Sequence, residues 1–304
     1  MSTLFAEQFE NDSIARIQKF AKIANTYGFE IAVGFSGGKD SQVVYDLCKR
    51  AGVQFKAYYN VAFESATTKR FIREHYPDVV WRRDHKFGFI ENIWRNHNGL
   101  LPTIEIAYCC EDYKHNPKYV DKCSIIGVRR QEGASRSTRT PISFKNKTTQ
   151  KKLAKDVTPY FVENCQSVGT ASVIQLLPIV DWSEQDVWDY IHRYNLPINN
   201  EYKTAKRVGC IVCPKANLSH NYRALVRYPK LIDAFIKAKE TNSSCDWVIT
   251  SDEKDYSEDK VYYICRWLNR SFRPFSKRQE REYELVKQAY LNAHKNVKNI
   301  SIKT

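Results

Sequence analysis

The sequence predicts an α/β fold: a Rossmann-like, doubly wound and mainly parallel sheet followed by a helical C-terminal extension. Over the first two thirds of the chain, short apolar strands alternate with segments whose apolar residues recur at helical spacing. From about residue 218 the pattern becomes almost wholly helical. A chain of 304 residues is long enough for one large domain with an appendage. We therefore expect the α/β domain over residues 1–215 and the extension over residues 216–304.

The predicted elements follow one another in βα order. A helix over 12–27 stops at Gly28, and the next segment, 30–35 (EIAVGF), lacks polar alternation, as in strands covered on both faces. After a glycine-rich turn come a helix ending at Gly52, a strand over 55–61, a helix over 67–75 and a strand over 79–81. The remaining elements are a short helix after Cys109-Cys110, a strand over 123–130, a strand over 173–180 and a helix over 183–195.

The charge balance is strongly basic, with 48 Lys and Arg residues against 34 Asp and Glu and a net charge of +14. Such an excess favours polyanionic partners such as DNA or tRNA, although a lysine-rich solvated surface explains it equally well. Lysines concentrate over 145–155, which we interpret as a polar loop. No apolar run reaches the roughly 20 residues that span a bilayer, and the acidic N-terminus lacks a signal-peptide pattern. We expect a cytoplasmic protein without membrane contact.

The turn after the first strand reads Ser36-Gly37-Gly38-Lys39-Asp40-Ser41. Two glycines let the backbone bend tightly and let phosphate oxygens approach the amides. The helix that follows presents unpaired N–H groups to an anion, and Lys39 adds a full charge. Ser36 and Ser41 offer hydroxyls, while Asp40 orients the turn or holds Mg²⁺. The spacing is not that of a Walker A loop. We predict a phosphate site here.

Four blocks in this order resemble the phosphoadenosine phosphosulfate (PAPS) reductase family of the N-type ATP pyrophosphatases, also called adenine nucleotide alpha hydrolases. The blocks are SGGKDS, Cys109-Cys110 with Lys114, Gly127-Val128-Arg129-Arg130-x-Glu132-x-x-x-Arg136, and Leu177-Pro178-Ile179-x-Asp181-Trp182 with Asp186-Val187-Trp188. The resemblance spans about residues 30–215 and implies reaction at the α-phosphate of an adenine nucleotide, without a covalent enzyme intermediate at the turn.

The resemblance also implies roles for residues outside the turn. Arg129, Arg130 and Arg136 are expected to clamp phosphate or sulfate, because a guanidinium recognises such anions bidentately. Glu132 is expected to orient these arginines. Together with Lys39 and Asp40, the three arginines are the predicted catalytic residues. The predicted nucleotide-binding set adds three residues to the turn: Phe35, Asn60 and Gly127.

Four of the nine cysteines are clustered, as Cys109-Cys110 and Cys210-x-x-Cys213. In a chain expected in a reducing compartment, such clusters indicate metal binding or catalysis rather than disulfides. The pattern CC with a later CxxC resembles the iron–sulfur branch of the family, which includes adenylyl-sulfate reductases and a DNA phosphorothioation subunit. We expect a [4Fe–4S] cluster, with a Cys₄ zinc site or packed, redox-active thiols as alternatives.

Two features separate this sequence from the reductases. It has no cysteine after Cys265, whereas the reductases carry a nucleophilic cysteine near the C-terminus, and its SGGKDS turn is complete, which fits ATP itself. We therefore expect ATP-dependent adenylylation with pyrophosphate release in sulfur transfer, as in phosphorothioation of nucleic acid. A cysteine desulfurase or another sulfur donor is the expected partner, and a homo-oligomer is compatible with the sequence. The alternatives are a reductase of adenylyl sulfate or phosphoadenylyl sulfate, a sulfate adenylyltransferase subunit, and a nucleotide-binding regulator without turnover.

Overall fold

The computed structural model describes residues 3–26, 28–83, 86–115, 121–144, 174–240, 259–269 and 274–301. The chain forms two compact units. One comprises Met1–Val61, Ser65–Arg83 and Asn116–Gly209, and we call it the sheet unit; the other comprises Ala62–Glu64, Asp84–His115 and Cys210–Thr304, and we call it the helical unit. The two compact units are each made of several separate segments of the chain. The domain boundary that we expected between residues 215 and 216 remains a prediction.

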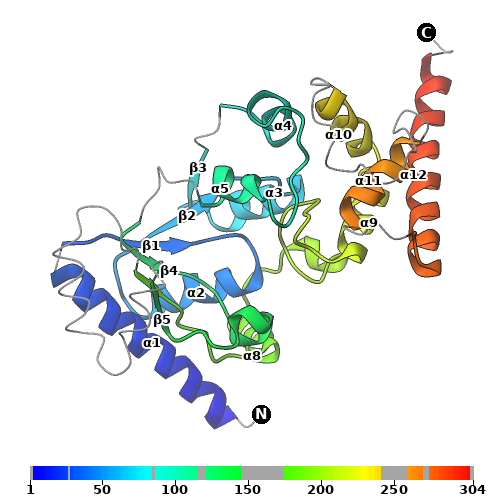
Figure 1. Cartoon of the computed structure of the whole chain (residues 1–304). Coiled ribbons are helices and arrows are strands. Elements are labelled where there is room, and N and C mark those ends of the chain that lie inside the picture. The colour runs from blue at the N-terminus through cyan, green and yellow to red at the C-terminus, as the bar shows by residue number, and fades with distance from the viewer. Residues whose placement is uncertain are drawn as a thin grey trace. The chain divides into compact units, whose positions relative to one another are not determined.

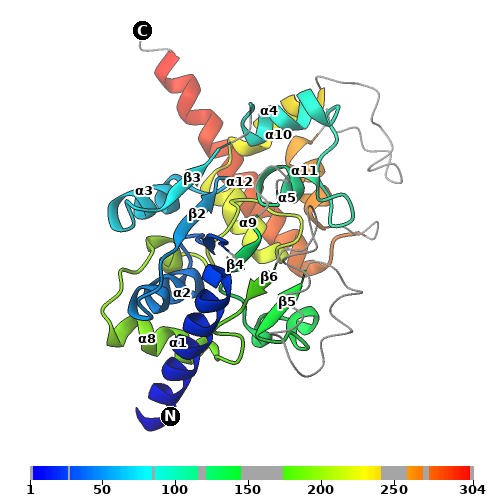
Figure 2. The same cartoon turned by 90° about the vertical axis from the view of Figure 1, so that its left-hand side faces the viewer.

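The sheet unit contains a six-stranded sheet with the order β3-β2-β1-β4-β6-β5 (Figures 1 and 2). The strands are β1 (Ile31–Gly34), β2 (Lys56–Asn60), β3 (Val80–Arg82), β4 (Cys123–Ile125), β5 (Ile142–Phe144) and β6 (Ile174–Leu176). All neighbouring pairs are parallel except β5 with β6, which is antiparallel. The predicted Rossmann-like, mainly parallel architecture is confirmed.

Strand β1 lies at the centre, where Val33 pairs with Ala57 of β2 on one side and Ile125 of β4 on the other. The chain first builds β2 and β3 outward from β1, and then returns to build β4 and β6 on the opposite side. This reversal of strand order is a topological switch point, and ligands bind at the carboxyl ends of the strands there. The segments that follow β1 and β4 are therefore the expected ligand-binding segments.

Helices α1 (Thr3–Thr26), α2 (Lys39–Arg50) and α8 (Glu184–Arg193) lie together on one face of the sheet (Figure 1). Their buried apolar residues join those of the strands in one core, which contains Ile17, Val44 and Ile191 beside Val33. The sheet unit also holds α3 (Ala66–His75) and three short 3₁₀ helices, η1 (Arg130–Glu132), η2 (Ala134–Arg136) and η3 (Asn200–Lys203).

Helix termini in the sheet unit coincide with capping residues. The Ser65 side chain accepts a hydrogen bond from the Thr68 N–H at the start of α3, and Ser183 accepts one from the Asp186 N–H at the start of α8. The Asp186 carboxylate accepts the Ser183 N–H in return, which completes a capping box. At the end of α2 the chain turns at Gly52, whose φ of +68° favours glycine.

Several boundaries differ from those expected. Helix α1 begins at residue 3 instead of 12, and the strands expected over 123–130 and 173–180 are limited to β4 and β6. The short helix expected after Cys109-Cys110 instead contains both cysteines, as α5 (Tyr108–Tyr113). Helix α4 (Phe89–Asn96) and strand β5 were not predicted. The lysine-rich loop expected over 145–155 lies outside the described residues.

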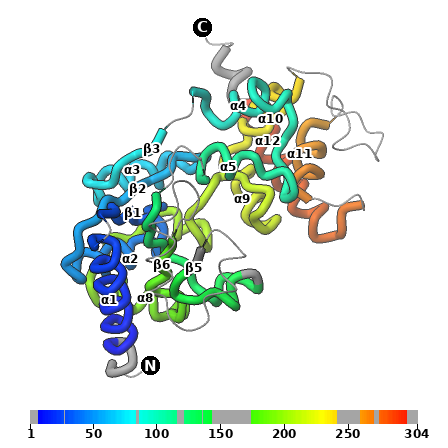
Figure 3. The backbone as a smooth tube through the Cα atoms, turned by 60° about the vertical axis from the view of Figure 1, so that its left-hand side comes forward, coloured from blue at the N-terminus to red at the C-terminus, as the bar shows by residue number. Residues whose placement is uncertain are grey.

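The helical unit is built from α4, α5, α9 (Leu218–Arg227), α10 (Leu231–Glu240), α11 (Lys260–Asn269) and α12 (Lys277–Ser301). Helix α10 packs on α4 and α11, and α12 packs on α9 and α11 (Figure 3). Its separate core includes Phe235, Ile264 and Leu268. No helix in the described part of the chain is long and apolar enough to cross a membrane.

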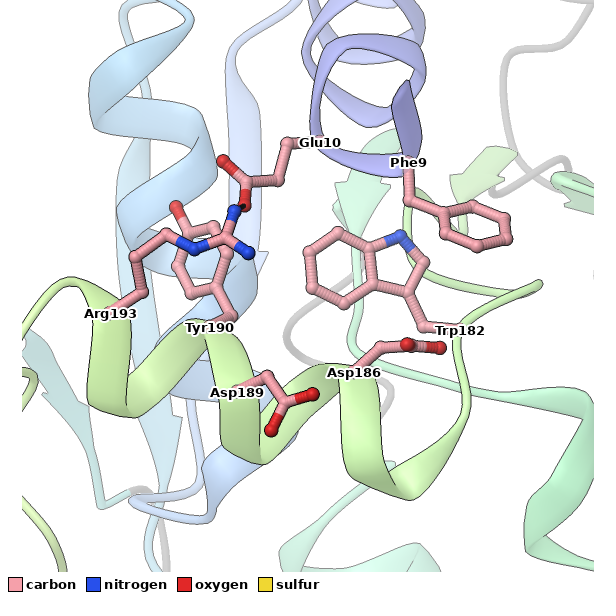
Figure 4. A pocket seen from close by; sticks show the side chains of 7 residues that line it. All are labelled: Phe9, Glu10, Trp182, Asp186, Asp189, Tyr190 and Arg193. Carbon is pink, nitrogen blue, oxygen red and sulfur yellow. Dashed lines mark hydrogen bonds and ion pairs between the residues drawn. The ribbon is translucent and has the colours of Figure 1, made fainter. Parts of the chain in front are cut away.

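A small cavity of about 110 Å³ lies in the sheet unit between α1 and α8 (Figure 4). Its lining residues are Phe9, Glu10, Trp182, Asp186, Asp189, Tyr190 and Arg193. The Glu10 carboxylate is buried and accepts hydrogen bonds from Arg50, Arg193 and the Tyr194 hydroxyl. None of the lining residues belongs to the glycine-rich turn, and the paired charges connect α1 to α8.

Candidate functional site

The glycine-rich turn lies directly after β1, at the switch point of the sheet. Gly37 has φ of +72°, and a Cβ added there would lie 3.0 Å from the Ile72 side chain and 3.3 Å from the Thr68 side chain. Both the backbone conformation and the close approach of α3 therefore require glycine at this position.

Two serines hold the shape of the turn. The Ser41 hydroxyl accepts the Ser36 N–H at 3.2 Å and donates to the Gly38 carbonyl at 2.8 Å. The Ser36 hydroxyl donates to Ser41 Oγ at 3.2 Å. Both hydroxyls thus bond within the turn, and the ligand contacts expected of them remain a prediction.

Lys39 begins helix α2, whose first intrahelical hydrogen bond runs from the Gln42 N–H to the Gly38 carbonyl. The Lys39 side chain is only 6% exposed, and its ammonium lies 3.4 Å from Asp40 Oδ2 and 3.4 Å from Glu184 Oε1. It therefore places a full positive charge beside the first turn of α2, where the N–H groups have no intrahelical acceptors, and this arrangement attracts a polyanion.

Arg129 reaches the same turn from the segment after β4. Its side chain is 4% exposed, and its Nε donates to Asp40 Oδ1. Its Nη1 is buried and has no hydrogen-bond partner among the described residues. A buried, unsatisfied guanidinium nitrogen is costly, so this atom is a strong candidate for contact with a ligand oxygen.

Gly127 allows this close approach between the two segments. A Cβ at position 127 would lie 2.7 Å from the Asp40 carbonyl oxygen and 2.8 Å from its carbonyl carbon. The backbone after β4 therefore touches the first turn of α2. The structure brings Gly127 and Arg129 to the predicted phosphate turn.

Arg130 and Arg136 have carboxylate partners of their own. Arg130 pairs with Asp181, and its Nε donates to the Arg139 carbonyl at 2.8 Å. Arg136 pairs with Glu132, which also accepts the Arg129 N–H at 3.0 Å. Glu132 thus contacts the Arg136 guanidinium and the Arg129 backbone. Its orienting role and the clamp role of Arg130 and Arg136 remain predictions.

The other two predicted nucleotide-binding residues occupy different environments. Phe35 is 3% exposed, and its ring packs against Tyr45 and Tyr76 with centroid distances of 5.5 and 4.6 Å. Its side chain belongs to the core, which leaves only its backbone near the turn. Asn60 is the last residue of β2 and lies at the carboxyl edge of the sheet.

Three residues near the turn were absent from the predicted site. The Tyr202 hydroxyl accepts the Lys39 N–H at 2.8 Å, and the fully buried Asn199 donates to the Gly37 carbonyl at 3.0 Å. Trp188 of α8 lies 5.1 Å from the Tyr202 ring, centroid to centroid, and the Lys39 ammonium lies 6.0 Å from its ring centroid. They lie some 150 residues beyond the turn, and their only sequence signal was the block containing Trp188.

The four clustered cysteines all belong to the helical unit. Cys109 and Cys110 lie in α5, which the Asp112 carboxylate anchors through hydrogen bonds with Asn92 and His97, each 2.8 Å long. The Cys210–Cys213 loop is held by α9, where Asn221 exchanges two hydrogen bonds of 2.9 Å with the Cys213 backbone. Segments a hundred residues apart in sequence thus contribute thiols to one unit.

Neighbouring groups shift the pKa values of these thiols. A hydrogen bond between the two side chains raises the pKa of Cys109 and lowers that of Cys110. Burial raises the pKa of Cys210 to about 11, against the opposing effect of Lys114. Burial acts to lower the pKa of Lys114, but the nearby Cys210 and Glu64 outweigh it and the pKa is raised. Lys114 therefore supplies a positive charge beside the thiols.

The cysteine set fits a thiolate-bound centre in its donor chemistry. Charges on Cys110, Cys210 and Cys213 all act on Cys109, so the four thiols lie within electrostatic range of one another. Among the described residues, however, no three His, Cys, Asp or Glu side chains are arranged to hold a metal ion.

Comparison with known proteins identifies the family. The model of the phosphoadenosine phosphosulfate reductase domain matches residues 30–216, and the chain belongs to this family. Its members are enzymes that act on adenosine nucleotides in sulfur metabolism. The expected family membership is therefore confirmed, and the matched region contains both the glycine-rich turn and all four clustered cysteines.

The individual relatives have low sequence identity to this chain. An uncharacterised protein of Methanocaldococcus jannaschii is 26% identical over 84% of this chain and 56% of its own length. The sulfate adenylyltransferase subunit 2 of a Caulobacter species is 36% identical over 57% of this chain and 59% of its own length. A solved phosphoadenylyl-sulfate reductase from Candida auris, in a phosphate complex, has a TM-score of 0.39 at 13% identity, covering 69% of this chain and 96% of that one. The chain spans about half the length of the first of these relatives.

Proposed function

We propose that this chain is an ATP-dependent adenylyltransferase that acts in sulfur transfer and releases pyrophosphate. One observation carries the proposal: the complete SGGKDS turn meets the buried Arg129 at the switch point of the sheet. Lys39 and Arg129 supply two cations there, and Arg129 Nη1 has no partner among the described residues. Two cations beside the first turn of a helix suit a polyphosphate better than a monoanion.

In the proposed reaction an acceptor oxygen attacks the α-phosphorus of ATP. The bond from that phosphorus to the bridging oxygen breaks, and pyrophosphate leaves with the electron pair. A thiol reductant releases the persulfide sulfur of the donor as hydrosulfide. This hydrosulfide then attacks the acceptor atom that carries the adenylyl group, and the bond from that atom to the AMP oxygen breaks as AMP leaves with the electron pair. The chain contributes positioning and charge neutralisation, for which preorganised cations in a partly buried site are effective.

The carboxylates at the turn balance these cations before ATP binds. Both oxygens of Asp40 face cations, Oδ1 towards Arg129 and Oδ2 towards Lys39. Glu184 is 61% exposed and can turn into solvent when phosphates approach Lys39. Asp40 is the residue of the turn that would hold Mg²⁺, which would neutralise phosphate charge.

The buried state of Cys265 favours this reaction over thiol-dependent reduction. Cys265 lies in α11 with no exposed surface, and burial raises the pKa of its thiol. A reductase nucleophile must be an accessible thiolate, which this cysteine is not. The ATP-dependent route needs no thiol at the reacting phosphorus.

Nucleic acid is the acceptor that we propose, with a cysteine desulfurase or a similar protein as the sulfur donor. The net charge of +14 supports binding to a polyanion. Association of the chain with DNA or tRNA should then weaken steeply with salt, with a log–log slope near 0.9 for each DNA phosphate neutralised. Salt-independent or undetectable binding to both would remove nucleic acid as the acceptor.

The four clustered cysteines would hold a [4Fe–4S] cluster, and Lys114 would balance part of its negative charge. A cluster in this place supplies either sulfur-carrying chemistry or structural cross-linking of α5 to the Cys210–Cys213 loop. Iron and acid-labile sulfide analysis of anaerobically purified protein tests the assignment, with about four of each expected per chain. One equivalent of zinc without iron would replace the cluster with a Cys₄ zinc site.

Substitution of Lys39 tests the turn directly. Lys39→Ala should abolish pyrophosphate release from ATP, because it removes the cation at the head of α2. Lys19→Ala is the matched control, since Lys19 is an exposed lysine of α1. Release should be assayed with DNA, tRNA and sulfate as acceptors in separate reactions. A Lys39→Ala protein that keeps most of its activity would show that the turn is not the reacting phosphate site.

A further inference from the structure

Tyr202 occupies a position that none of the sequence motifs marks. Its hydroxyl accepts the N–H of Lys39 at 2.8 Å, at the head of α2. The N–H groups of a first helical turn have no intrahelical acceptors and point at any ligand bound there. The tyrosine hydroxyl therefore lies between one of these amides and the space in front of the helix.

Tyr202 is held firmly in this position. It lies in η3, where its N–H donates to the Asn199 carbonyl at 3.0 Å and the Asn199 side chain accepts the Glu201 N–H. Asn199 is fully buried and also donates to the Gly37 carbonyl. The Asn199 side chain thus connects η3 to the glycine-rich turn. The Trp188 ring packs edge-on against the Tyr202 ring, with 5.1 Å between centroids.

The hydroxyl retains a proton that it can donate. Burial raises the pKa of Tyr202, so the phenol stays protonated at neutral pH. A hydroxyl that accepts one hydrogen bond still has its own O–H to give. No described residue accepts this proton from Tyr202, although the Lys39 N–H occupies the oxygen.

Two cations at the glycine-rich turn favour an anion as the missing acceptor. The Lys39 ammonium lies 5.8 Å from the centroid of the Tyr202 ring. The Arg129 guanidinium, bound to Asp40 in the same turn, keeps a buried Nη1 without a partner among the described residues. Two cations and two unused donor groups, the Tyr202 hydroxyl and the Arg129 Nη1, therefore lie at the same turn, where phosphate oxygens can accept from them.

We propose that Tyr202 is part of the anion site, and that its hydroxyl accepts the Lys39 N–H while donating its own proton to a bound phosphate. The helix terminus then reaches the ligand through the phenol instead of directly. The inference rests on the proposed nucleotide function of the turn. It adds a phosphate-binding residue from η3, which belongs to the last segment of the sheet unit in the sequence.

The test compares Tyr202→Phe with the wild type in equilibrium binding of a non-hydrolysable ATP analogue, pyrophosphate and adenosine. The phenylalanine keeps the ring that packs on Trp188 and removes only the hydroxyl. Affinity for the ATP analogue and pyrophosphate should fall about tenfold or more, as for loss of a hydrogen bond to a charged group, while affinity for adenosine stays the same. Tyr194→Phe, which removes a hydroxyl bound to Glu10 instead, is the matched control.

Any other result of these binding measurements would contradict the role proposed for Tyr202 or the proposed function. Unchanged or tighter phosphate binding by Tyr202→Phe would overturn the inference, and tighter binding would show that the hydroxyl competes with phosphate for the Lys39 N–H. An equal loss of adenosine affinity, or a lowered melting temperature, would reduce Tyr202 to a packing residue. If the wild type binds pyrophosphate but no ATP analogue, the proposed function fails. The pyrophosphate affinity of Tyr202→Phe then tests the role of Tyr202 by itself. Wild-type protein that binds neither overturns both proposals.

Discussion

At the scale of single residues, the glycine-rich turn has positive charges that a bound anion would neutralise. Arg129 is almost completely buried, yet only its Nε is bound to Asp40, and its Nη1 lacks a partner among the described residues. Leaving a buried donor unsatisfied costs roughly 1–3 kcal/mol, and more when the donor is charged. Because folding tolerates this cost at the switch point of the sheet, the unsatisfied donor is best explained by a ligand that accepts from it.

Sequence reasoning identified part of this residue set. Lys39 and Gly37 were marked by a contiguous motif, and Gly127 and Arg129 by a second motif. Tyr202 and Asn199 carried no signal because a tyrosine and an asparagine in a loop have no distinctive pattern. Their contacts with the turn arise only when η3 folds back onto it.

Glu10 provides a residue-scale prediction about stability. Glu10→Gln should lower the free energy of unfolding by about 1–3 kcal/mol, because Arg50 and Arg193 lose their shared carboxylate charge. Both arginines are about one third exposed, so water moderates the loss. Urea denaturation measures it. Glu7→Gln, at an exposed position of α1, is the control and should change little; equal stability of the two variants would contradict the prediction.

At the scale of elements, the site depends on how closely the segment after β4 approaches α2. Gly127→Ala should lower stability by about 1–3 kcal/mol and weaken nucleotide binding, because the added Cβ would lie 2.7 Å from the Asp40 carbonyl oxygen. Backbone atoms cannot rotate away as a side chain can. Thermal denaturation and ATP-analogue binding measure the two effects.

Gly209→Ala is the control for this substitution, since a Cβ there meets no atom within 4 Å. If Gly127→Ala binds nucleotide and melts like Gly209→Ala, the two segments do not approach each other as closely as described.

The capping box of α8 gives a second element-scale prediction. Ser183→Ala should cost about 1 kcal/mol, because it leaves the Asp186 N–H without its side-chain acceptor. Gln185→Ala, at an exposed position in the same helix, should remain within about 0.5 kcal/mol of the wild type. Chemical denaturation of both proteins compares them, and a loss of similar size in each would argue against the cap.

The sequence predicted most central elements and missed short or peripheral ones. The parallel strands near the turn were visible as apolar runs between glycine and helical signals. Strand β5 has only three residues and pairs antiparallel with β6, so its existence depends on a partner more than on its own sequence. Helix α4 did carry a signal, since Phe89, Ile90, Ile93 and Trp94 recur at helical spacing.

At the scale of the whole molecule, each compact unit is built from segments that are not contiguous in the sequence. Residues 84–115 belong to the same unit as residues 210–304, although the sheet-forming segment 116–209 lies between them in sequence. Cys109 and Cys110 thereby join Cys210 and Cys213 in one unit. Such a discontinuous unit cannot be recognised from local periodicity, which reports only on residues near one another in the chain.

The central claim is that the sheet unit catalyses a reaction at the α-phosphate of ATP. The most direct test is to identify the products formed from ATP that is labelled at the α-phosphate. In the presence of the acceptor, the account predicts release of unlabelled pyrophosphate, with the label in an adenylylated acceptor or in AMP. Lys39→Ala should produce neither. Formation of labelled ADP with orthophosphate would place the reaction at the γ-phosphate and contradict the account.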